Sequence, residues 1–507
     1  MRVVIVGAGI NGLVAANYLQ RAGCRVTLVE RAGHVGGACV AATAEIDGAR
    51  QDYAHGASVL GLMQDFVFEE TGLAARLRTY APTHPKLVYY PGHDEPVRIW
   101  REPERLDREF HEKFGERGDA VAFRADEAKV VEFLQRGFRE ARPPTVADAE
   151  AVLGTELTRR WITGSARELL EHYFTSEATR VYMAMTVTES GPVALSEPYS
   201  AFVIPMMDSG SVFGGYYGFV RGGIWQITAE LDRINRELGV EVRLGCAVRE
   251  VDKERRQVLV DDHGDGASLG YDHLIMATDT VTAARLAGSP ELVNRTRAER
   301  LLGSAGKLTL MFRQPVRWKR GSDLPEADAA FRFIFAEDSL DGFERAAASV
   351  VNGQSYHPGY IQIYCEGAAM RLMGLREPFD RIIAFFNFLA LDRPGDEWPQ
   401  VQAEVQRAVF GLIANPEDCA WARLLTPRDL QDTFLFPGGN LDHTMLVAGQ
   451  TYFDRGYSTD PATSFYRMGG DARVHVCGAG TYPCGSVAGT PGYMCATQLL
   501  RGTQQLI

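Results

Sequence analysis

The chain has 507 residues, of which 46% are hydrophobic and 23% are charged, a composition typical of a globular protein large enough for more than one domain. The formal net charge is −12, and the sequence has no long basic tract. Because nucleic-acid binding depends on clustered Lys and Arg side chains, nucleic acid is excluded as an expected partner.

The first predicted element is a strand that ends in a glycine-rich turn. The apolar run 2–6 is followed by Gly7, Gly9 and Gly12 in the spacing G-x-G-x-x-G, where a helical pattern begins. Gly7 permits the tight turn, Gly9 lets a pyrophosphate approach the backbone, and Gly12 lets the helix pack close to the strand. A second apolar run ends at Glu30, whose carboxylate can accept hydrogen bonds from a ribose. The pattern therefore predicts a βαβ unit whose helix N-terminus faces the phosphates of a dinucleotide.

The residues after Glu30 indicate which dinucleotide binds. Gly36 and Gly37 allow the chain to return close to the pyrophosphate, as FAD proteins of this fold usually require and NAD dehydrogenases do not. The alternative interpretation of this pair is an ordinary loop. No second G-x-G-x-x-G follows a strand, and residues 264–266 are interpreted as a hairpin turn. We therefore expect one tightly held cofactor and no separate pyridine-nucleotide domain.

Later segments alternate between two kinds of pattern. Residues 222–278 and 473–500 combine helices and strands that suit further parts of the nucleotide-binding domain. The intervening segments mix strands with helices, and the charge-rich stretch 105–124 is interpreted as a solvated helix and turn. In these segments we expect strands at 86–90, 97–100, 308–312 and 360–364, and helices at 125–139 and 400–412.

The cysteines and the apolar runs of the sequence indicate the cellular compartment in which we expect the protein. The eight cysteines are scattered and form no C-x-x-C pair, which predicts free thiols in a reducing, cytoplasmic compartment. A fingerprint that begins at residue 2 leaves no room for a signal peptide. The longest apolar stretch, 382–391, is too short to span a bilayer and is expected to be a core element. The sequence does not decide whether the protein contacts a membrane surface without spanning it.

Taken together, these motifs resemble those of the phytoene-desaturase-like flavoproteins. The branch that the sequence resembles most is that of the pyridine nucleotide-disulphide oxidoreductase domain-containing proteins, and amine and amino-acid oxidases share the fold more distantly. The resemblance covers nearly the whole chain. The motifs that carry it are residues 7–37, 218–223 with 239–242, 425–430, 438–443, and 477–483 continuing to 489–492.

The resemblance implies an α/β fold with a doubly wound, glutathione-reductase-like FAD-binding domain and an inserted α+β substrate domain. The FAD-binding domain would comprise residues 1–70, 213–300 and 430–507, and the substrate domain residues 71–212 and 301–429. The final glycine-rich turn would return to the flavin. The residues expected to bind FAD are Gly7, Gly9, Asn11, Gly12, Glu30, Arg31, Gly36, Gly37, Ala38, Val248, Ala277, Gly478, Gly480 and Gly489.

Three side chains are candidates for catalysis. Lys307 resembles the position where amine oxidases place a lysine that holds water at flavin N5, and the alternative is a surface lysine at a strand edge. His443 lies near the last motif, where an imidazole can move a proton or orient substrate, although a lone histidine is more often structural. Tyr482 stands where the family usually has histidine, which favours a small specialised metabolite over a long carotenoid. Cys484 and His55 are expected near the flavin without an assigned role.

The predicted function is dehydrogenation of a C–C or C–N bond in a largely apolar small molecule, with hydride transfer to flavin N5. Dioxygen or a quinone would reoxidise the flavin. One alternative is an amine or amino-acid oxidase that produces peroxide, and another is a redox-neutral isomerase or saturase. A non-enzymatic protein that binds lipidated partners, as Rab GDP-dissociation inhibitors do, is a further alternative, which the intact glycines at both ends of the chain disfavour.

Overall fold

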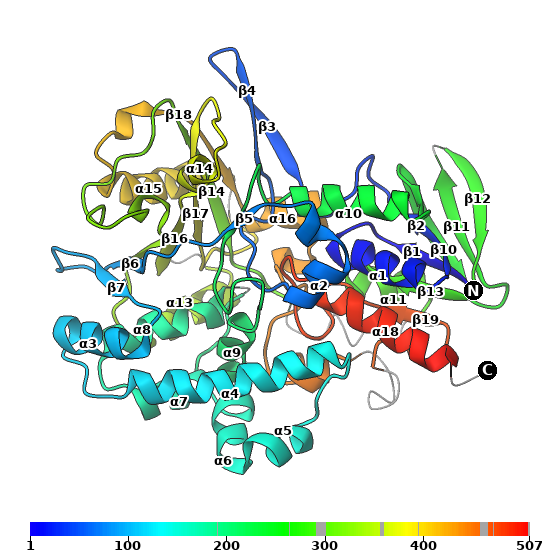
Figure 1. Cartoon of the computed structure of the whole chain (residues 1–507), viewed down its shortest axis with the longest axis horizontal. Coiled ribbons are helices and arrows are strands. Elements are labelled where there is room, and N and C mark those ends of the chain that lie inside the picture. Colours follow the sequence, from blue (N-terminus) through cyan, green and yellow to red (C-terminus); the bar gives the residue numbers. More distant parts are fainter. Residues whose placement is uncertain are drawn as a thin grey trace.

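The first strand of the chain lies at the centre of a five-stranded parallel sheet (Figure 1). This computed structural model describes residues 1–189, 191–262, 264–289, 301–354, 359–393, 395–456, 465–469 and 471–504. Three distant parts of the chain supply the strands, as the sequence pattern predicts. In sheet order these are β19 (Val474–Val476), β13 (His273–Met276), β1 (Arg2–Val6), β2 (Arg25–Val29) and β9 (Glu241–Arg243).

Helices and a smaller sheet surround this parallel sheet. Helix α1 (Ile10–Arg21) packs against both α10 (Gln226–Glu237) and α18 (Thr490–Gln504), which come from the middle and the end of the chain. Helix α11 (Thr280–Leu286) contacts the first strand of an antiparallel three-stranded sheet. The last two strands of that sheet form the hairpin predicted around residues 264–266. Its strands are β10 (Cys246–Asp252), β11 (Gln257–Asp262) and β12 (Asp265–Gly270).

A seven-stranded sheet forms the other half of the molecule (Figure 1). Its neighbouring strands are antiparallel except for β15 and β6, which run parallel. The apolar stretch that begins at Ile382 lies in one of its central strands. In sheet order the strands are β18 (Cys419–Leu425), β14 (Gly306–Phe312), β17 (Asp380–Phe386), β16 (Tyr360–Tyr364), β15 (Arg332–Phe335), β6 (Lys86–Tyr89) and β7 (Val97–Ile99).

Helices from the middle of the chain pack below this sheet in the view of Figure 1. Helix α4 begins five residues before the expected start, because the side chain of Asp119 accepts a hydrogen bond from the backbone of Ala122 and caps it. Residues 105–114 of the predicted solvated segment belong to α3, in which only Leu106 and Phe110 are buried, whereas its last residues begin α4 and include the buried Ala120 and Phe123. The helices around this sheet include α3 (Pro103–Phe114), α4 (Ala120–Arg139), α5 (Val146–Leu153), α7 (Ala166–Tyr173), α8 (Glu177–Ala184), α9 (Val203–Met207), α13 (Leu340–Val351), α14 (Glu366–Leu372) and α15 (Trp398–Gly411).

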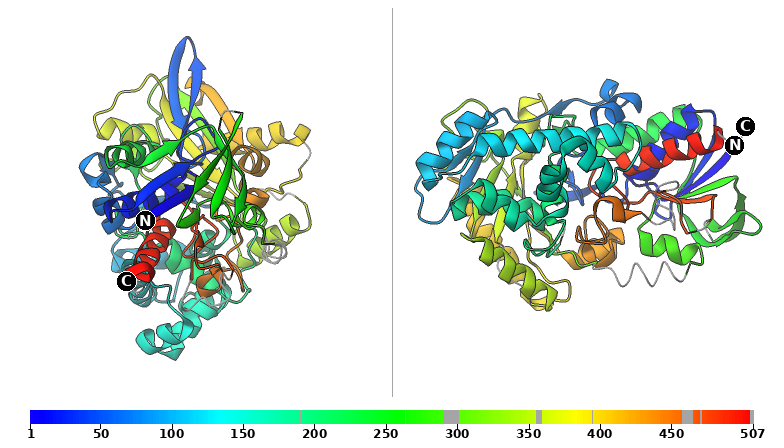
Figure 2. Two further views of the ribbon diagram at one scale, coloured as in Figure 1. Left: turned by 90° about the vertical axis from the view of Figure 1, so that its right-hand side faces the viewer. Right: turned by 90° about the horizontal axis from the view of Figure 1, so that it is seen from below.

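Two short ladders lie between the halves. Strands β3 (Ala41–Ile46) and β4 (Ala49–Ala54) form a hairpin that projects from the body of the molecule (Figure 2). Strand β5 (Thr79–Tyr80) pairs with β8 (Phe219–Val220) and so joins distant segments of the chain. The structure is thus a mixed α/β fold, and the division into domains stays a prediction.

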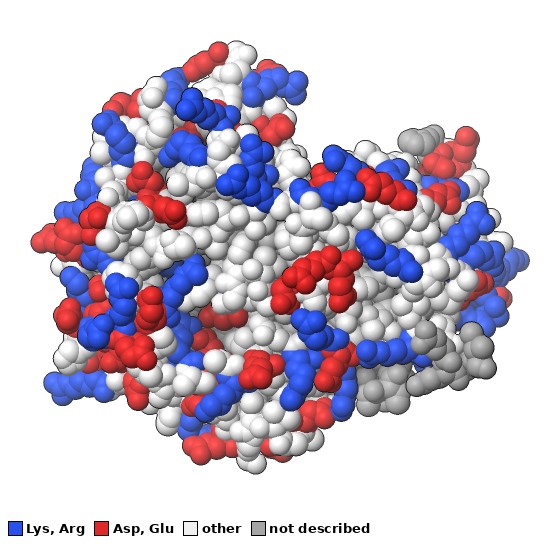
Figure 3. All heavy atoms as spheres, in the orientation of Figure 1, with Lys and Arg blue, Asp and Glu red and all other residues white. Residues whose placement is uncertain are grey.

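The surface charges, the lengths of the helices and the cysteines can be compared with the expectations from composition. Acidic and basic side chains are interspersed over the face shown in Figure 3. Within the described ranges, no helix is both long and apolar enough to cross a membrane. All eight cysteines are free thiols, and seven of them are buried.

Candidate active site

A cavity of about 630 Å³ extends from the glycine-rich turn of the five-stranded sheet to strands β16 and β17 of the seven-stranded sheet. Its size is that of a small-molecule or cofactor site. The predicted FAD-binding residues that line it are Gly7, Gly9, Asn11, Glu30, Arg31, Gly36, Gly37, Ala38, Val248 and Ala277.

The turn between β1 and α1 is open towards this cavity. A Cβ atom added at Gly9 would meet only the Cα atom of Gly37, at 4.0 Å. No side chain caps the N-terminus of α1, so its first backbone N–H groups have no side-chain acceptor. The glycine pair returns here, since the N–H of Gly36 donates to the carbonyl of Ala8 at 2.8 Å. This is a cradle in which backbone N–H groups and the helix dipole can bind phosphate.

The carboxylate of Glu30 is held at the end of β2. One oxygen accepts a hydrogen bond from the N–H of Ala8 and the other from the N–H of Ala32, both at 2.9 Å. Each carboxylate oxygen has a second lone pair, so both can still accept hydrogen bonds from ribose hydroxyls. Glu30 therefore ties the phosphate turn to the position where a ribose would lie.

Four of the predicted glycines pack the walls and do not line the cavity. A Cβ atom at Gly12 would lie 2.0 Å from the carbonyl oxygen of Gly7, and one at Gly478 would lie 1.8 Å from that of Thr278. Gly489 adopts a φ of +69°, and its added Cβ would meet Val14 at 2.7 Å, whereas Gly480 lies against Thr280. Gly12 lets α1 pack on the phosphate turn, Gly478 and Gly480 let the last segment approach the residues after β13, and Gly489 lets it approach α1. All four glycines thus have a packing role.

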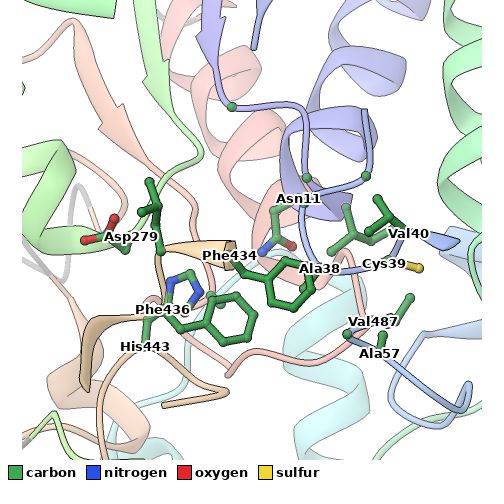
Figure 4. A pocket seen from close by; sticks show the side chains of 18 of the residues that line it. Asn11, Ala38, Cys39, Val40, Ala57, Asp279, Phe434, Phe436, His443 and Val487 are labelled. Carbon is green, nitrogen blue, oxygen red and sulfur yellow. The ribbon is translucent and has the colours of Figure 1, made fainter. Parts of the chain in front are cut away.

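His443 lines the cavity beside two aromatic rings and an acidic residue (Figure 4). Its ring centroid lies 4.9 Å from that of Phe436, and Phe434 points into the same space. Burial lowers the pKa of His443, while the charges of Asp279 and Asp442 oppose this shift. The Nδ1 atom is buried and has no hydrogen-bond partner among the described residues. A neutral imidazole with a free nitrogen is thus available to a bound molecule.

Lys307 does not line the cavity but supports the loop that does. Its ammonium donates to the carbonyl oxygens of Ala54, His55 and Gly56 at 2.5, 3.0 and 3.0 Å, which uses all three of its hydrogens. Lys307 lies on β14 between two other strands and is 5% exposed, so the alternative of a surface lysine is wrong. Burial lowers its pKa to about 7. The loop that it holds places His55, Gly56 and Ala57 in the cavity wall.

Tyr482 and Cys484 are fully buried and are not among the residues that line the cavity. The ring of Tyr482 packs 6.0 Å from Phe138 and 5.9 Å from Phe465, and its carbonyl accepts a hydrogen bond from Tyr466. Of Tyr482, Cys484 and His443, all expected near the flavin, only His443 borders the cavity. The final motif reaches the cavity through Ala479, Ser486 and Val487 instead.

The wall on the side of the seven-stranded sheet contains residues that the motifs do not indicate. Glu189, Met207, Tyr217, Tyr364 and Phe385 line it, so that one carboxylate lies in an apolar and aromatic surrounding. They come from distant segments with no recognisable spacing. The signal that the sequence offers is an acidic residue, Glu189, shortly after the mostly apolar run 181–187.

The unpartnered polar atoms of the wall test whether FAD suits this cavity. Asn11 Oδ1, His55 Nε2 and His443 Nδ1 are buried without a hydrogen-bond partner in the described part of the chain, and all three residues line the cavity. Buried polar groups left in this way are costly unless a bound molecule satisfies them. With the phosphate cradle at one end and aromatic side chains at the other, the wall fits a dinucleotide with a flavin ring.

Comparisons with known proteins agree with this geometry. A model of the flavin containing amine oxidoreductases matches residues 10–490. The pyridine nucleotide-disulfide oxidoreductase domain-containing protein 2 of Rattus norvegicus is 23% identical, over 99% of this chain and 94% of its own length. The 4,4'-diapophytoene desaturase of Staphylococcus aureus is 24% identical over 50% of this chain and 49% of its own.

Solved structures share the fold. Putrescine oxidase bound to putrescine superposes with a TM-score of 0.57 at 16% identity, covering 100% of this chain and 99% of that one. Cyclohexylamine oxidase from Brevibacterium oxydans has a TM-score of 0.54 at 14% identity, with 99% of both chains covered. The predicted resemblance, the FAD cofactor and the redox activity are confirmed: the chain is an FAD-dependent oxidoreductase that belongs to the family of flavin containing amine oxidoreductases.

Proposed function

We propose that the enzyme dehydrogenates a C–C or C–N bond of a largely apolar small molecule, and that FAD accepts the hydride. The observation that carries this proposal is the polarity of the cavity. It begins at a phosphate cradle beside Glu30 and ends at a wall of mostly apolar and aromatic side chains, among them Met207, Tyr217 and Phe385. A polar dinucleotide suits the first end and an apolar substrate the second.

Within this proposal, residues 1–70, 213–300 and 430–507 form a doubly wound FAD-binding domain, and the remaining segments form the substrate domain. The turn at Gly7 and Gly9 binds the pyrophosphate and Glu30 binds the ribose. The isoalloxazine ring lies beside His443, which positions substrate or moves a proton. Bound FAD supplies the two-electron chemistry, while the protein orients the substrate and excludes water. The support is the set of cavity-lining and unpartnered atoms described above.

Dioxygen or a quinone is the proposed electron acceptor, and the eight free thiols support a reducing, cytoplasmic location. A second candidate is an amine oxidase that produces hydrogen peroxide. The fold shared with putrescine oxidase and cyclohexylamine oxidase favours it. The match to a desaturase over half of the chain favours carbon–carbon dehydrogenation instead.

Anaerobic flavin bleaching separates these candidates. The purified, FAD-loaded protein is mixed without oxygen with amines (putrescine and cyclohexylamine), polyenes (phytoene) and simple alcohols. Loss of the oxidised flavin absorbance with a compound identifies its class as substrate, and admission of air then tests for peroxide. Bleaching by amines with stoichiometric peroxide would establish the second candidate and rule out the C–C bond of the first proposal, whereas bleaching by polyenes alone would rule out the second candidate. A flavin that no compound bleaches would refute both.

A further inference from the structure

The wall opposite the phosphate cradle contains a carboxylate that accepts a hydrogen bond from a neutral side chain. Glu189 follows the short helix η3 (Met185–Thr188) and is partly exposed to the cavity. Its Oε1 accepts a hydrogen bond from Gln362 Nε2 at 2.6 Å, and Gln362 Oε1 accepts one from the hydroxyl of Tyr364 at 2.9 Å. The described residues give the carboxylate no other hydrogen bond, so its second oxygen is available to a molecule in the cavity.

We propose that Glu189 is a catalytic residue that accepts the proton released as the substrate loses a hydride to FAD, with Gln362 and Tyr364 as positioning residues. This inference rests on the proposed function. Removal of two hydrogens breaks one C–H bond and a neighbouring C–H or N–H bond and forms a C=C or C=N bond. The hydride carries both electrons to FAD. The remaining proton goes to the carboxylate of Glu189, which becomes a carboxylic acid.

The direction of the hydrogen bonds supports this role. Because the Tyr364 hydroxyl donates to the carbonyl end of Gln362, the amide must present its N–H group to Glu189. That N–H stabilises a carboxylate and cannot take its proton. The hydrogen bonds thus fix one oxygen of Glu189 and leave the other for the substrate.

The surroundings of Glu189 also suit a base. Burial raises the pKa of its carboxyl to about 7, while the hydrogen bond from Gln362 and the charge of Lys86 oppose this shift and the charges of Asp208 and Asp442 add to it. A pKa close to neutral is effective for a general base, since a large share of the groups is ionised near pH 7 and the carboxylate still has affinity for a proton. The titratable groups that interact with Glu189 from the surrounding elements are Lys86, Asp208, Tyr217, Tyr360, Tyr364 and Asp442.

Position distinguishes Glu189 from the two histidines of the wall. His443 is next to Asp279, which lies three residues after the end of β13, at the carboxyl ends of the parallel strands, where the cofactor is expected (Figure 4). His55 belongs to the loop held by Lys307. Glu189 shares its wall with Met207, Tyr217 and Phe385, which suit the apolar body of a substrate. It therefore faces the substrate and not the dinucleotide.

The test compares three isosteric or near-isosteric variants as FAD-loaded proteins. Glu189→Gln removes the base, Gln362→Leu removes its hydrogen-bond donor, and Glu112→Gln changes an exposed glutamate of α3 as a matched control. Infrared pH titration detects the protonated carboxyl of Glu189 as the band missing from Glu189→Gln, without any substrate. Anaerobic stopped-flow mixing with the compound that bleaches the wild-type flavin fastest gives the reduction rate across the same pH range.

We expect a carboxyl band in the wild type that disappears near pH 7, and a reduction rate that rises with pH through the same value. Glu189→Gln should reduce its flavin about 100-fold more slowly or worse, the range for loss of a general base, while keeping FAD. Gln362→Leu should move both midpoints to higher pH, because the hydrogen bond that favours the carboxylate is gone. The control should match the wild type.

Two results would overturn the inference. One is a Glu189 carboxyl that is already ionised throughout the range near neutral pH. The other is flavin reduction in Glu189→Gln at the wild-type rate with the wild-type pH profile. Failure of every compound to bleach wild-type flavin is a different result, because it would refute the proposed function while the infrared titration still decides whether Glu189 has a near-neutral pKa.

Discussion

Replacing Gly9 by valine separates cofactor binding from folding. Gly9 has a φ of −71° and a ψ of 178°, which any residue can adopt, and an added Cβ meets only the Cα atom of Gly37 at 4.0 Å. The new side chain would occupy the space in which the pyrophosphate approaches the backbone. We therefore expect Gly9→Val to fold normally and to be purified without colour.

The magnitude follows from the hydrogen bonds that the phosphate could no longer accept. Moving the phosphate away from the N-terminus of α1 removes one or two charge-assisted hydrogen bonds, each worth about 1.5–3 kcal/mol. A loss of about 3 kcal/mol corresponds to roughly 100-fold weaker FAD binding. Gly12→Ala is the contrasting variant, because its Cβ would lie 2.0 Å from the carbonyl oxygen of Gly7. We expect this overlap to destabilise the fold by about 1–3 kcal/mol.

FAD titration followed by flavin fluorescence measures the first effect, and thermal unfolding of the cofactor-free proteins measures the second. We expect Gly9→Val to lose FAD at unchanged stability and Gly12→Ala to lose stability. Full flavin occupancy in Gly9→Val would refute the assignment of this turn to the pyrophosphate. Equal destabilisation of both variants would refute the distinction between open and packed glycines.

Three further substitutions test individual side chains. Glu30→Ala should weaken FAD binding by about 1–3 kcal/mol in the same titration, the cost of lost hydrogen bonds that leave partners unpaired, and unchanged affinity would remove Glu30 from the ribose site. Lys307→Met should lower thermal stability and slow flavin reduction and reoxidation together, because three loop carbonyls lose their donor. Selective slowing of reoxidation in stopped-flow traces would instead support the predicted role at flavin N5. Tyr482→Phe should leave FAD content and substrate affinity unchanged, since its ring packs against Phe138 and Phe465, and a raised KM would contradict this.

Local patterns predict which residues line the cavity around the phosphate cradle. The turn at Gly7 and Gly9, the acidic residue at the end of β2 and the glycine pair at Gly36 and Gly37 lie within a short stretch of sequence, where spacing determines geometry. Parallel strand pairing then brings the segments around β13 and β19 to the same sheet edge. The cavity lining near Ala277 and Ala479 follows from that pairing.

The substrate half depends on tertiary packing and could not be predicted in the same way. Glu189 and Tyr364 meet at the cavity because a short helix contacts the seven-stranded sheet, and no local spacing encodes that contact. Lys307 shows the same dependence on packing, and its role at flavin N5 stays a prediction. Its place at the head of an apolar strand suggested a flavin-facing or a surface lysine, yet the carbonyl groups of a distant loop surround it. The side-chain direction at Tyr482 was likewise set by aromatic packing.

A crystal structure of the FAD-loaded protein tests the central claim, the direction of the cofactor in this cavity, most directly. We predict that the ribose of the adenosine half contacts Glu30, that the pyrophosphate lies at Gly9, and that the isoalloxazine ring lies beside His443 with its substrate face open towards Glu189. An isoalloxazine ring at Glu30, or FAD bound outside the cavity, would contradict the account.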